Sequence, residues 1–209
     1  MTDPTDPIDP CNDPTPPIQC IVTRGDITED DVKCAQQEWC RGLLEISRLY
    51  WQRPRGDFRG YAERFINTFY DFLPEGAGRV FFRPTLAKFP DNFRTTRAGT
   101  LEYFIGKEGN DDDPDDGFAK KKFLDAKYSN RVDTEATAIQ RYGRIAIAMG
   151  NVCLMEAVVD PDHPDDPNPE IKNTVVDKTF VYRKDDRGEV RLTLHMSALR
   201  NEKDKPPVE

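Results

Sequence analysis

The sequence lacks an uninterrupted apolar run of about eighteen residues, the length that a membrane-spanning helix needs. Its first residues, Met1-Thr2-Asp3-Pro4, supply neither the basic nor the apolar region of a secretory signal. We therefore expect no membrane span, and either a cytoplasmic chain or the mature form of an organellar protein. The motifs typical of phosphate-binding loops, dinucleotide sites, zinc proteases and serine hydrolases are also absent.

Histidine and cysteine are scarce. The chain has two histidines, His163 and His195, and therefore cannot build a three-histidine zinc site. Its five cysteines are odd in number and contain no C-x-x-C pair, which disfavours a disulfide framework or a thiolate zinc site. We expect reduced thiols in a reducing compartment.

The negative charge is unevenly distributed. The chain has 38 acidic and 30 basic residues, a formal net charge of −8. Residues 1–23, 110–117 and 160–169 hold 13 of the acidic residues, no basic residue and 11 of the 17 prolines. The remainder has 25 acidic and 30 basic residues and is about +5. The acidity therefore belongs to tails and loops around a mildly basic body, and we expect no nucleic-acid partner.

The first half of the chain predicts helices. Thr28 and Asp31 form an acidic version of a capping box, which opens a helix. Apolar residues then recur every three or four positions, as in a helix of about twenty residues; they are Val32, Ala35, Trp39, Leu43, Ile46 and Tyr50. A second helical stripe consists of Tyr61, Phe65, Phe69 and Phe72. Residues 79–83 predict a short strand, and residues 97–104 a short helix that buries Leu101 and Phe104.

The second half predicts strands. Residues 123–132, 135–141, 143–158, 173–184 and 189–199 are rich in β-branched and aromatic types between polar turns. Residues 185–188 predict a hairpin turn between the last two segments. Helices followed by long strands predict an α+β fold in which a curved antiparallel sheet wraps around N-terminal helices as a cone.

We divide the chain into three parts. The repeated Asp-Pro pairs near the start cannot form a helix, because proline removes a backbone donor and extends the residue before it. Residues 1–25 are therefore an Asp/Pro-rich extended arm, which we expect to bind another protein or to aid solubility. Residues 26–200 form the cone-shaped domain, and residues 201–209 form a C-terminal tail.

Several short stretches, in order along the chain, carry a family resemblance. They are residues 27–39 (ITEDDVKCAQQEW), 82–85 (FRPT), 93–106 (FRTTRAGTLEYFIG), 116–119 (DGFA), 147–151 (IAMGN), 178–182 (KTFVY) and 194–197 (LHMS). Together they resemble the iota class of carbonic anhydrases over residues 26–200. That resemblance implies the cone fold shared by ketosteroid isomerases and nuclear transport factor 2. It also implies hydration of carbon dioxide to bicarbonate.

The resemblance further implies a set of site residues. The threonine of the family's P-T motif corresponds to Thr85, and the tyrosine of its Y-F-x-G motif to Tyr103. The family's terminal His-His-Ser-Ser motif appears here as His195, Met196, Ser197 and Ala198. Several family members work without metal and some diatom members are associated with manganese, so no cofactor is expected, with manganese or zinc left open.

The altered motif makes strand geometry decisive. Side chains alternate faces along a strand, so His195 and Ser197 share one face and Met196 and Ala198 the other. We favour the face of His195 and Ser197 as the pocket face, although Leu192 and Leu194 leave the choice open. On that face the hydroxyls of Thr85, Tyr103 and Ser197 would orient water and stabilise the product, with His195 as proton acceptor or relay.

The same residues also have ordinary structural interpretations. Thr85 shapes a turn, Tyr103 and His195 are satisfied core residues, and Arg94 and Arg97 are solvated cations rather than groups that steer an anion. Two other functions therefore stay open. One is a non-catalytic oligomerisation or scaffold module, as in the association domain of calmodulin-dependent kinase. The other is a lyase or isomerase with Glu102 or Asp125 as base. In each case we expect a homodimer or larger homo-oligomer.

Overall fold

A computed structural model describes residues 20–52, 56–73, 78–87, 89–107, 117–130, 138–160, 162–163 and 166–199. Most of the Asp/Pro-rich arm, the acidic residues 110–116 and the C-terminal tail lie outside the described residues. Within the described ranges, no helix is long and apolar enough to cross a membrane.

Three helices precede the long strands, as the sequence predicts. Helix α1 (Glu29–Trp51) begins at the capping box of Thr28 and Asp31, and buries the predicted stripe that includes Trp39, Leu43 and Ile46. Helix α2 (Phe58–Phe69) is capped by Asp57 and ends before Phe72. The last residue of the second predicted stripe therefore lies beyond the helix. Helix α3 (Arg97–Ile105) is capped by Thr96 and buries Phe104, while Leu101 is half-buried.

Long antiparallel strands form most of the sheet. They are β2 (Lys122–Ser129), β3 (Ile139–Tyr142), β4 (Ile145–Ala157), β5 (Ile171–Lys184) and β6 (Val190–Leu199). With the short strand β1 (Phe81–Arg83) at one edge, the order across the sheet is β1-β6-β5-β4-β2, and β3 pairs with β4. A short 3-10 helix, η3 (Phe118–Lys120), leads into β2. The predicted hairpin turn connects β5 and β6, where Asp185 and Glu189 form a backbone hydrogen bond.

The short strand β1 (Phe81–Arg83) departs from the prediction of a purely antiparallel sheet. It pairs parallel to β6, with Phe82 beside His195 and Arg83 beside Met196. Pro84 follows directly, and proline cannot donate to a continuing ladder. The sheet is therefore antiparallel except at this edge.

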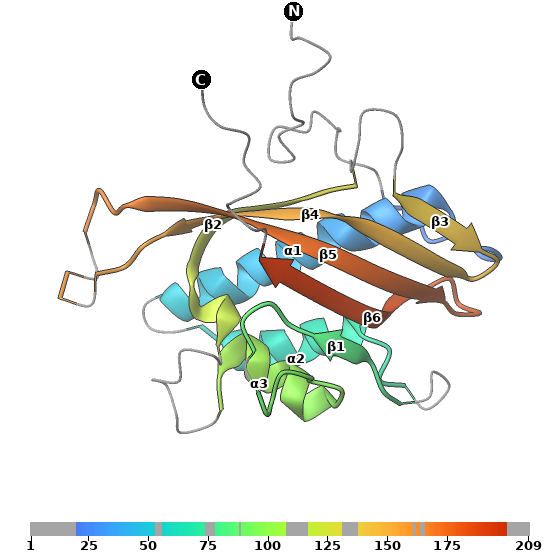
Figure 1. Ribbon diagram of the computed structural model, residues 1–209, viewed down its shortest axis with the longest axis horizontal. Helices are drawn as coiled ribbons and strands as arrows, with labels where there is room; N and C mark the ends of the chain where they lie inside the picture. Colours follow the sequence, from blue (N-terminus) through green and yellow to red (C-terminus); the bar gives the residue numbers. More distant parts are fainter. Residues whose placement is uncertain are drawn as a thin grey trace, which may run out of the picture.

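Helices cover one face of the sheet. Figure 1 shows α1 running behind the long strands, with α2 and α3 beside β1 below them. The core between helices and sheet combines aliphatic side chains with a cluster of aromatic ones, among them Trp39, Phe65, Phe82, Phe104 and Phe180. The predicted α+β class, with a curved sheet wrapped around N-terminal helices, is confirmed.

The expectation of reduced thiols is wrong. Cys20 and Cys34 form a disulfide across a sequence separation of 14, and Cys153 is also disulfide-bonded. The Cα atoms of Cys20 and Cys34 lie 5.4 Å apart, within the ordinary range for a disulfide. Cysteine spacing cannot reveal this pair, because the proximity arises only when residues 20–23 fold back along α1. Cys40 is a free, buried thiol.

Candidate functional site

The inner face of β6 carries His195 and Ser197. Their side chains are 1% and 2% exposed, whereas Met196 between them is 49% exposed. The face that we favoured from the sequence is therefore the one directed at the core. The two positions of the motif that differ from the family, Met196 and Ala198, both lie on the outer face, away from this site.

Thr85 and Ser197 form a hydroxyl pair. Thr85 Oγ1 donates to Ser197 Oγ at 2.9 Å, and Ser197 Oγ donates to the backbone carbonyl of Arg83 at 3.5 Å. The guanidinium of Arg83 in turn donates to the backbone carbonyl of Ser197 at 2.9 Å. Because β1 runs parallel to β6, the residues just after β1 reach the end of β6. Thr85 is half-buried and Ser197 is buried, so the pair lies at the edge of the core.

Tyr103 supports the loop that carries Thr85. Backbone hydrogen bonds from Thr85 and Leu86 favour its phenolate, as does the nearby charge of Arg94, but burial outweighs them and raises the pKa of Tyr103 above its usual value. A tyrosine with a raised pKa stays protonated at neutral pH. Tyr103 is therefore suited to donate a hydrogen bond and to position Thr85, not to act as a base.

His195 lies one row further into the core than the hydroxyl pair. Its Nδ1 is 2.9 Å from the hydroxyl of Tyr70, and its Nε2 is 3.0 Å from Nζ of Lys178. Its ring stacks on Phe82 at a centroid distance of 4.4 Å and meets Phe180 edge-on at 4.6 Å. Both ring nitrogens therefore have partners inside the core.

Two neighbouring bases in this core have lowered pKa values. Burial, followed by the charge of Lys178, holds the pKa of His195 well below its usual value, so the imidazole is neutral at pH 7. Burial lowers the pKa of Lys178 from 10.5 to about 7. Of the two groups, Lys178 keeps the higher pKa.

The sequence interpretation assigned no role to Lys178 or Tyr70. Lys178 alternates with Phe180 and Tyr182 along β5, so a lysine on the inward parity of a strand was the available signal. Tyr70 had no such signal, because it follows α2 and belongs to none of the long strands; its backbone meets β6 through an isolated bridge with Leu192. Trp39 Nε1 donates to its hydroxyl at 3.2 Å.

The charged candidates fall into different environments. Arg94 is 7% exposed, which corrects the expectation of a solvated side chain, whereas Arg97 is exposed. Glu102 pairs with Arg94 at 3.5 Å. Asp125 accepts from its neighbouring backbone amide and pairs with Lys127, at 41% side-chain exposure. Neither carboxylate has a hydrogen bond to the Thr85–Ser197 pair.

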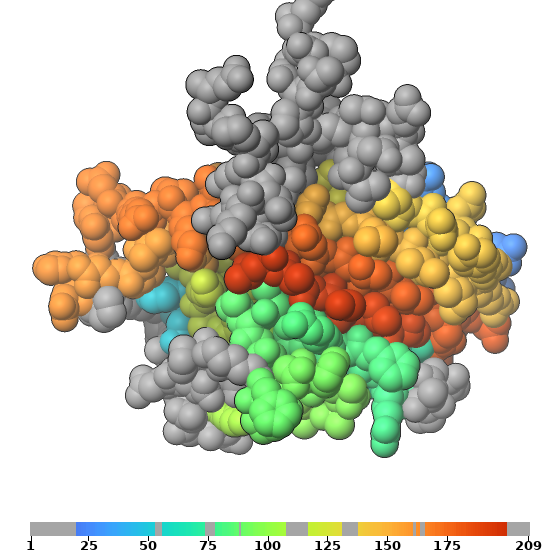
Figure 2. All heavy atoms as spheres, in the orientation of Figure 1, coloured from blue at the N-terminus to red at the C-terminus, as the bar shows by residue number. Residues whose placement is uncertain are grey.

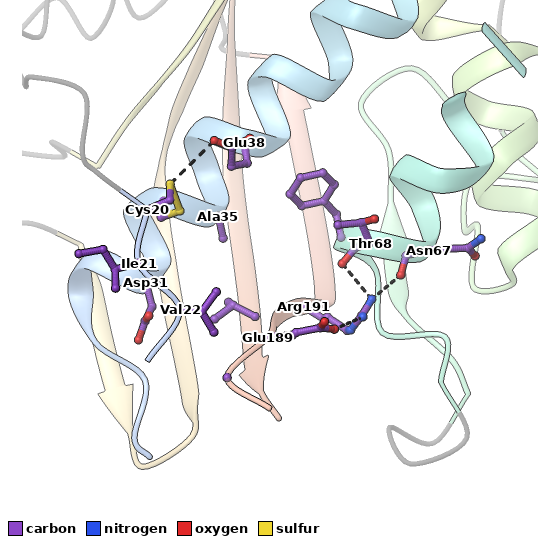
Figure 3. Close-up of a pocket in the computed structure, with 14 residues that line it drawn as sticks. Cys20, Ile21, Val22, Asp31, Ala35, Glu38, Asn67, Thr68, Glu189 and Arg191 are labelled. Carbon is purple, nitrogen blue, oxygen red and sulfur yellow. Dashed lines mark hydrogen bonds and ion pairs between the residues drawn. A yellow bond between two sulfur atoms is a disulfide. The ribbon is translucent and has the colours of Figure 1, made fainter. Parts of the chain in front are cut away.

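A separate cavity of about 410 Å³ lies at the opposite end of β6. Figure 3 shows it between α1, the end of α2 and the start of β6. Its charged groups have partners: Arg191 donates to Glu189 and to the backbone carbonyls of Asn67 and Thr68, and Asp31 accepts from Lys184. The cavity does not include any of the predicted site residues.

Metal binding would need several ligating side chains close together. In the part of the chain that the structure describes, no group of three or more histidine, cysteine, aspartate or glutamate side chains is arranged to hold a metal ion. The donors that gather around the site are instead hydroxyls, an imidazole and an amine.

Fold and site together define a class: a cone-shaped α+β protein whose helices and sheet enclose a cluster of hydroxyl donors beside a buried base. The chain belongs to the metal-independent carbonic anhydrase family, whose model matches residues 30–199. The resemblance predicted from the sequence is thereby confirmed.

Two relatives are similar to most of the chain. A metal-independent carbonic anhydrase from Nostoc sp. (strain PCC 7120) is 36% identical over 179 residues, which cover 86% of this chain and 76% of the relative. The crystal structure of a cyanobacterial iota-carbonic anhydrase complexed with bicarbonate is 35% identical, with a TM-score of 0.67. That match covers 88% of this chain and 99% of the crystallised one.

Proposed function

We propose that this protein catalyses the reversible hydration of carbon dioxide to bicarbonate, with Thr85, Tyr103 and Ser197 binding the reactants and His195 acting from within the core. The observation that carries the assignment is the 2.9 Å contact between Thr85 and Ser197, which places two hydroxyls side by side at the edge of the core. The match to the metal-independent carbonic anhydrase family supports the same reaction.

The hydroxyl pair has the polarity that this reaction requires. Thr85 uses its proton on Ser197, which leaves its oxygen lone pairs to accept from a water molecule. The attacking oxygen of that water is then oriented toward carbon dioxide. The hydroxyl proton of Tyr103 is available to stabilise negative charge as an oxygen of carbon dioxide becomes an oxygen of bicarbonate.

A stopped-flow assay of carbon dioxide hydration on chelator-treated protein tests the proposal. We expect a rate above the uncatalysed background without added metal. Thr85→Ala removes the group that orients water, and we expect kcat/KM to fall by roughly 100-fold. The matched control is Thr68→Ala, since Thr68 is an exposed threonine on α2 far from the pair. Absence of any rate in the wild type, or an equal rate in Thr85→Ala, would falsify the assignment.

Metal independence is tested in the same assay. We propose that the site works without a metal cofactor, as the name of the family states for its members. The expected result is that manganese or zinc added to chelator-treated protein leaves the rate unchanged. A rate that appears only after addition of either ion contradicts metal independence but not the reaction itself.

We further propose that the protein is a homodimer. The outer face of the sheet presents apolar side chains in register across strands: Phe81 of β1 lies beside Leu194 of β6, which lies beside Val181 of β5 and then Ile147 of β4. The next row includes Met196 and Met149, at 49% and 52% exposure. The same row also contains Arg83 and Thr179, so the face is an apolar strip with a polar border, and a strip of this kind is typical of an interface.

The compartment and the partner of the arm stay predictions. Disulfides such as Cys20–Cys34 persist in oxidising compartments and are rare in the cytosol, which favours a placement outside the reducing cytoplasm. Residues 1–19 lie outside the described residues, so binding of another protein by the acidic arm rests on its composition alone.

A further inference from the structure

Lys178 occupies an unusual position for a lysine. It lies in the middle of β5 with its side chain on the inner face, at 6% exposure. In the β5–β6 ladder its residue is directly opposite Ser197, one of the two hydroxyls of the pair. Side chains opposite each other on one face of an antiparallel pair have Cβ atoms only about 5 Å apart. Lys178 is therefore adjacent to the proposed reaction site.

Lys178 has no acidic partner among the described residues. None of the ion pairs in that part of the chain includes it, whereas the other fully buried lysine, Lys184, pairs with Asp31 at 2.7 Å. Instead, Nζ of Lys178 lies 3.0 Å from Nε2 of His195 and 5.3 Å from the ring centroid of Trp39. Burying an amine without a carboxylate is costly unless the amine is neutral. The buried amine of Lys178 therefore does not stabilise the fold, and we look for its role in function.

The contacts around His195 form a hydrogen-bonded chain that accommodates both forms of the amine. When Lys178 is neutral, Tyr70 donates to Nδ1 of His195, and Nε2–H donates to Lys178. When Lys178 is charged, it donates to Nε2, and Nδ1–H donates to the oxygen of Tyr70. The distances of 2.9 and 3.0 Å suit either arrangement. Taking up a proton at Lys178 thus needs a change of histidine tautomer and a rotation of the Tyr70 hydroxyl.

We propose that Lys178 holds the proton released in the reaction, and that His195 is a positioning residue whose imidazole keeps the amine of Lys178 in place beside Ser197. This inference rests on the proposed hydration of carbon dioxide. It adds a proton-holding residue and gives His195 a different task from accepting the proton itself.

The step balances in atoms and charge. The oxygen of water bonds to the carbon of carbon dioxide while one O–H bond of that water breaks. The proton passes from the water to Thr85 and from Thr85 to Ser197. The hydroxyl of Ser197 turns from the carbonyl of Arg83 and gives its proton to the neutral amine of Lys178, whose single lone pair has turned away from Nε2–H of His195. Carbon dioxide, water and a neutral amine thus become bicarbonate and an ammonium group. The ammonium then returns its proton to solvent, which restores the starting state.

The groups around Lys178 leave it as the one that titrates near neutrality. From α1 it faces Cys40, whose pKa burial raises to about 12. Beyond Cys40 on β2 are Tyr128, whose pKa burial also raises, and Asp125, which acts on Cys40. From β6 it faces His195, whose pKa burial lowers. Behind the His195 ring lies Tyr70, whose pKa burial raises. Burial brings the pKa of Lys178 to about 7.

The pH dependence of the rate follows from this value. A proton acceptor must be neutral, so the hydration rate is expected to rise with pH through about 7 and to level off above it. Lys178→Met keeps the length of the side chain and removes the amine. We expect it to lose the rise near pH 7 and to lower kcat by about 100-fold. Added imidazole buffer should restore part of the rate. Lys172→Met, an exposed lysine on the same strand, is the control that keeps the wild-type profile.

A second measurement does not depend on activity. In protein labelled with ¹³C at lysine Cε, one resonance of the wild type should titrate near pH 7 and be missing from Lys178→Met. Wild-type titration of every lysine near pH 10, or an active Lys178→Met enzyme with an unchanged profile, overturns the role of Lys178. A wild type without any hydration rate overturns the proposed function instead. If the labelled lysine still titrates near pH 7 in that protein, the amine was assigned correctly and the reaction was wrong.

Discussion

Ser197 shows how a single short side chain gains its position from three segments. Its strand directs it inward, Arg83 of β1 holds its backbone carbonyl, and Thr85 donates to its hydroxyl. A serine hydroxyl alone is a common and weakly informative feature. The nearby hydroxyl of Thr85 makes the pair a site, because two such groups 2.9 Å apart can bind a water and an oxyanion together.

Tyr103 is expected to support Thr85 in addition to binding the reactants. Its hydroxyl bonds to the backbone of Thr85 and Leu86, so Tyr103→Phe removes the support of this loop and leaves the aromatic core intact. We expect a loss of about 1 kcal/mol in the free energy of unfolding, the usual value of one hydrogen bond, and a clear fall in kcat. Chemical denaturation together with the hydration assay measures both.

The matched control for Tyr103 is Tyr142→Phe. Tyr142 is 62% exposed and bonds only to Gln140 two residues away, so its hydroxyl should be dispensable for both stability and rate. Equal behaviour of the two variants would contradict a supporting role for Tyr103.

The sequence predicts which strand residues lie on the same face of the sheet, but it does not predict which distant residues they contact. Alternation along a strand placed His195 and Ser197 together, and burial confirms it. The same rule, applied to residues 178–182, also puts Lys178 inside. The role that we propose for Lys178 depends on its hydrogen bond to His195, 17 positions away, and no local sequence pattern contains that contact.

At the scale of elements, the short strand β1 has the largest consequence for the site. Its residues were predicted as a strand, but the parallel pairing with β6 was not. A strand of three residues carries no pattern that specifies a partner or a direction. The antiparallel hairpin of β5 and β6, by contrast, follows from the short turn at residues 185–188, so it could be placed from the sequence alone.

The close packing of β2 on β4 depends on Gly150, a residue within a quoted motif. A Cβ at this position would lie 2.0 Å from the carbonyl oxygen of Ser129, so the backbones approach too closely for any side chain. Gly150 is also directly opposite Lys178 in the β4–β5 ladder. The motif residue is therefore structural, although the site lies beside it.

The disulfide between Cys20 and Cys34 fastens the segment before α1 to that helix. We predict that the double variant Cys20→Ser, Cys34→Ser loses about 3 kcal/mol in the free energy of unfolding, the value for a closed loop of about fifteen residues. Urea denaturation in non-reducing buffer measures the change. The hydration rate should be unaffected, because this segment lines the cavity at the far end of β6 from Ser197 (Figure 3).

A control for the disulfide variant lies in the same segment. Val22 is 74% exposed, so Val22→Ala should leave the midpoint of unfolding where it is in the wild type. Should the cysteine variant and the wild type unfold at the same urea concentration, the tether makes no contribution to stability.

At the scale of the whole molecule, the sheet separates two surfaces with different tasks. Its inner face packs on the helices and carries the candidate site, and its outer face is the surface through which we propose that two copies pack. Figure 2 shows side chains of β4, β5 and β6 forming a continuous surface on that outer side. The motif positions that depart from the family, Met196 and Ala198, belong to this surface, so we expect their change to bear on the proposed interface and not on the proposed site.

The outer surface of the sheet can be tested by placing a charge on it. If two copies pack through it, a charge at its centre should separate them, because burying an unpaired carboxylate in an apolar interface is costly. We expect wild-type protein to have twice the chain mass in solution by light scattering, and Met196→Asp to have the mass of one chain. Met196 lies opposite Thr179 of β5 and next to Arg83 of β1, on the face away from His195, so the separated chains should keep their fold. Phe89→Asp is the control, since Phe89 is 89% exposed in a loop outside the sheet and its change should leave the mass as in the wild type. A monomeric wild type, or a Met196→Asp variant that stays dimeric, shows that this face is not the interface, and in either case Thr85 and Ser197 keep their contact because both belong to one chain.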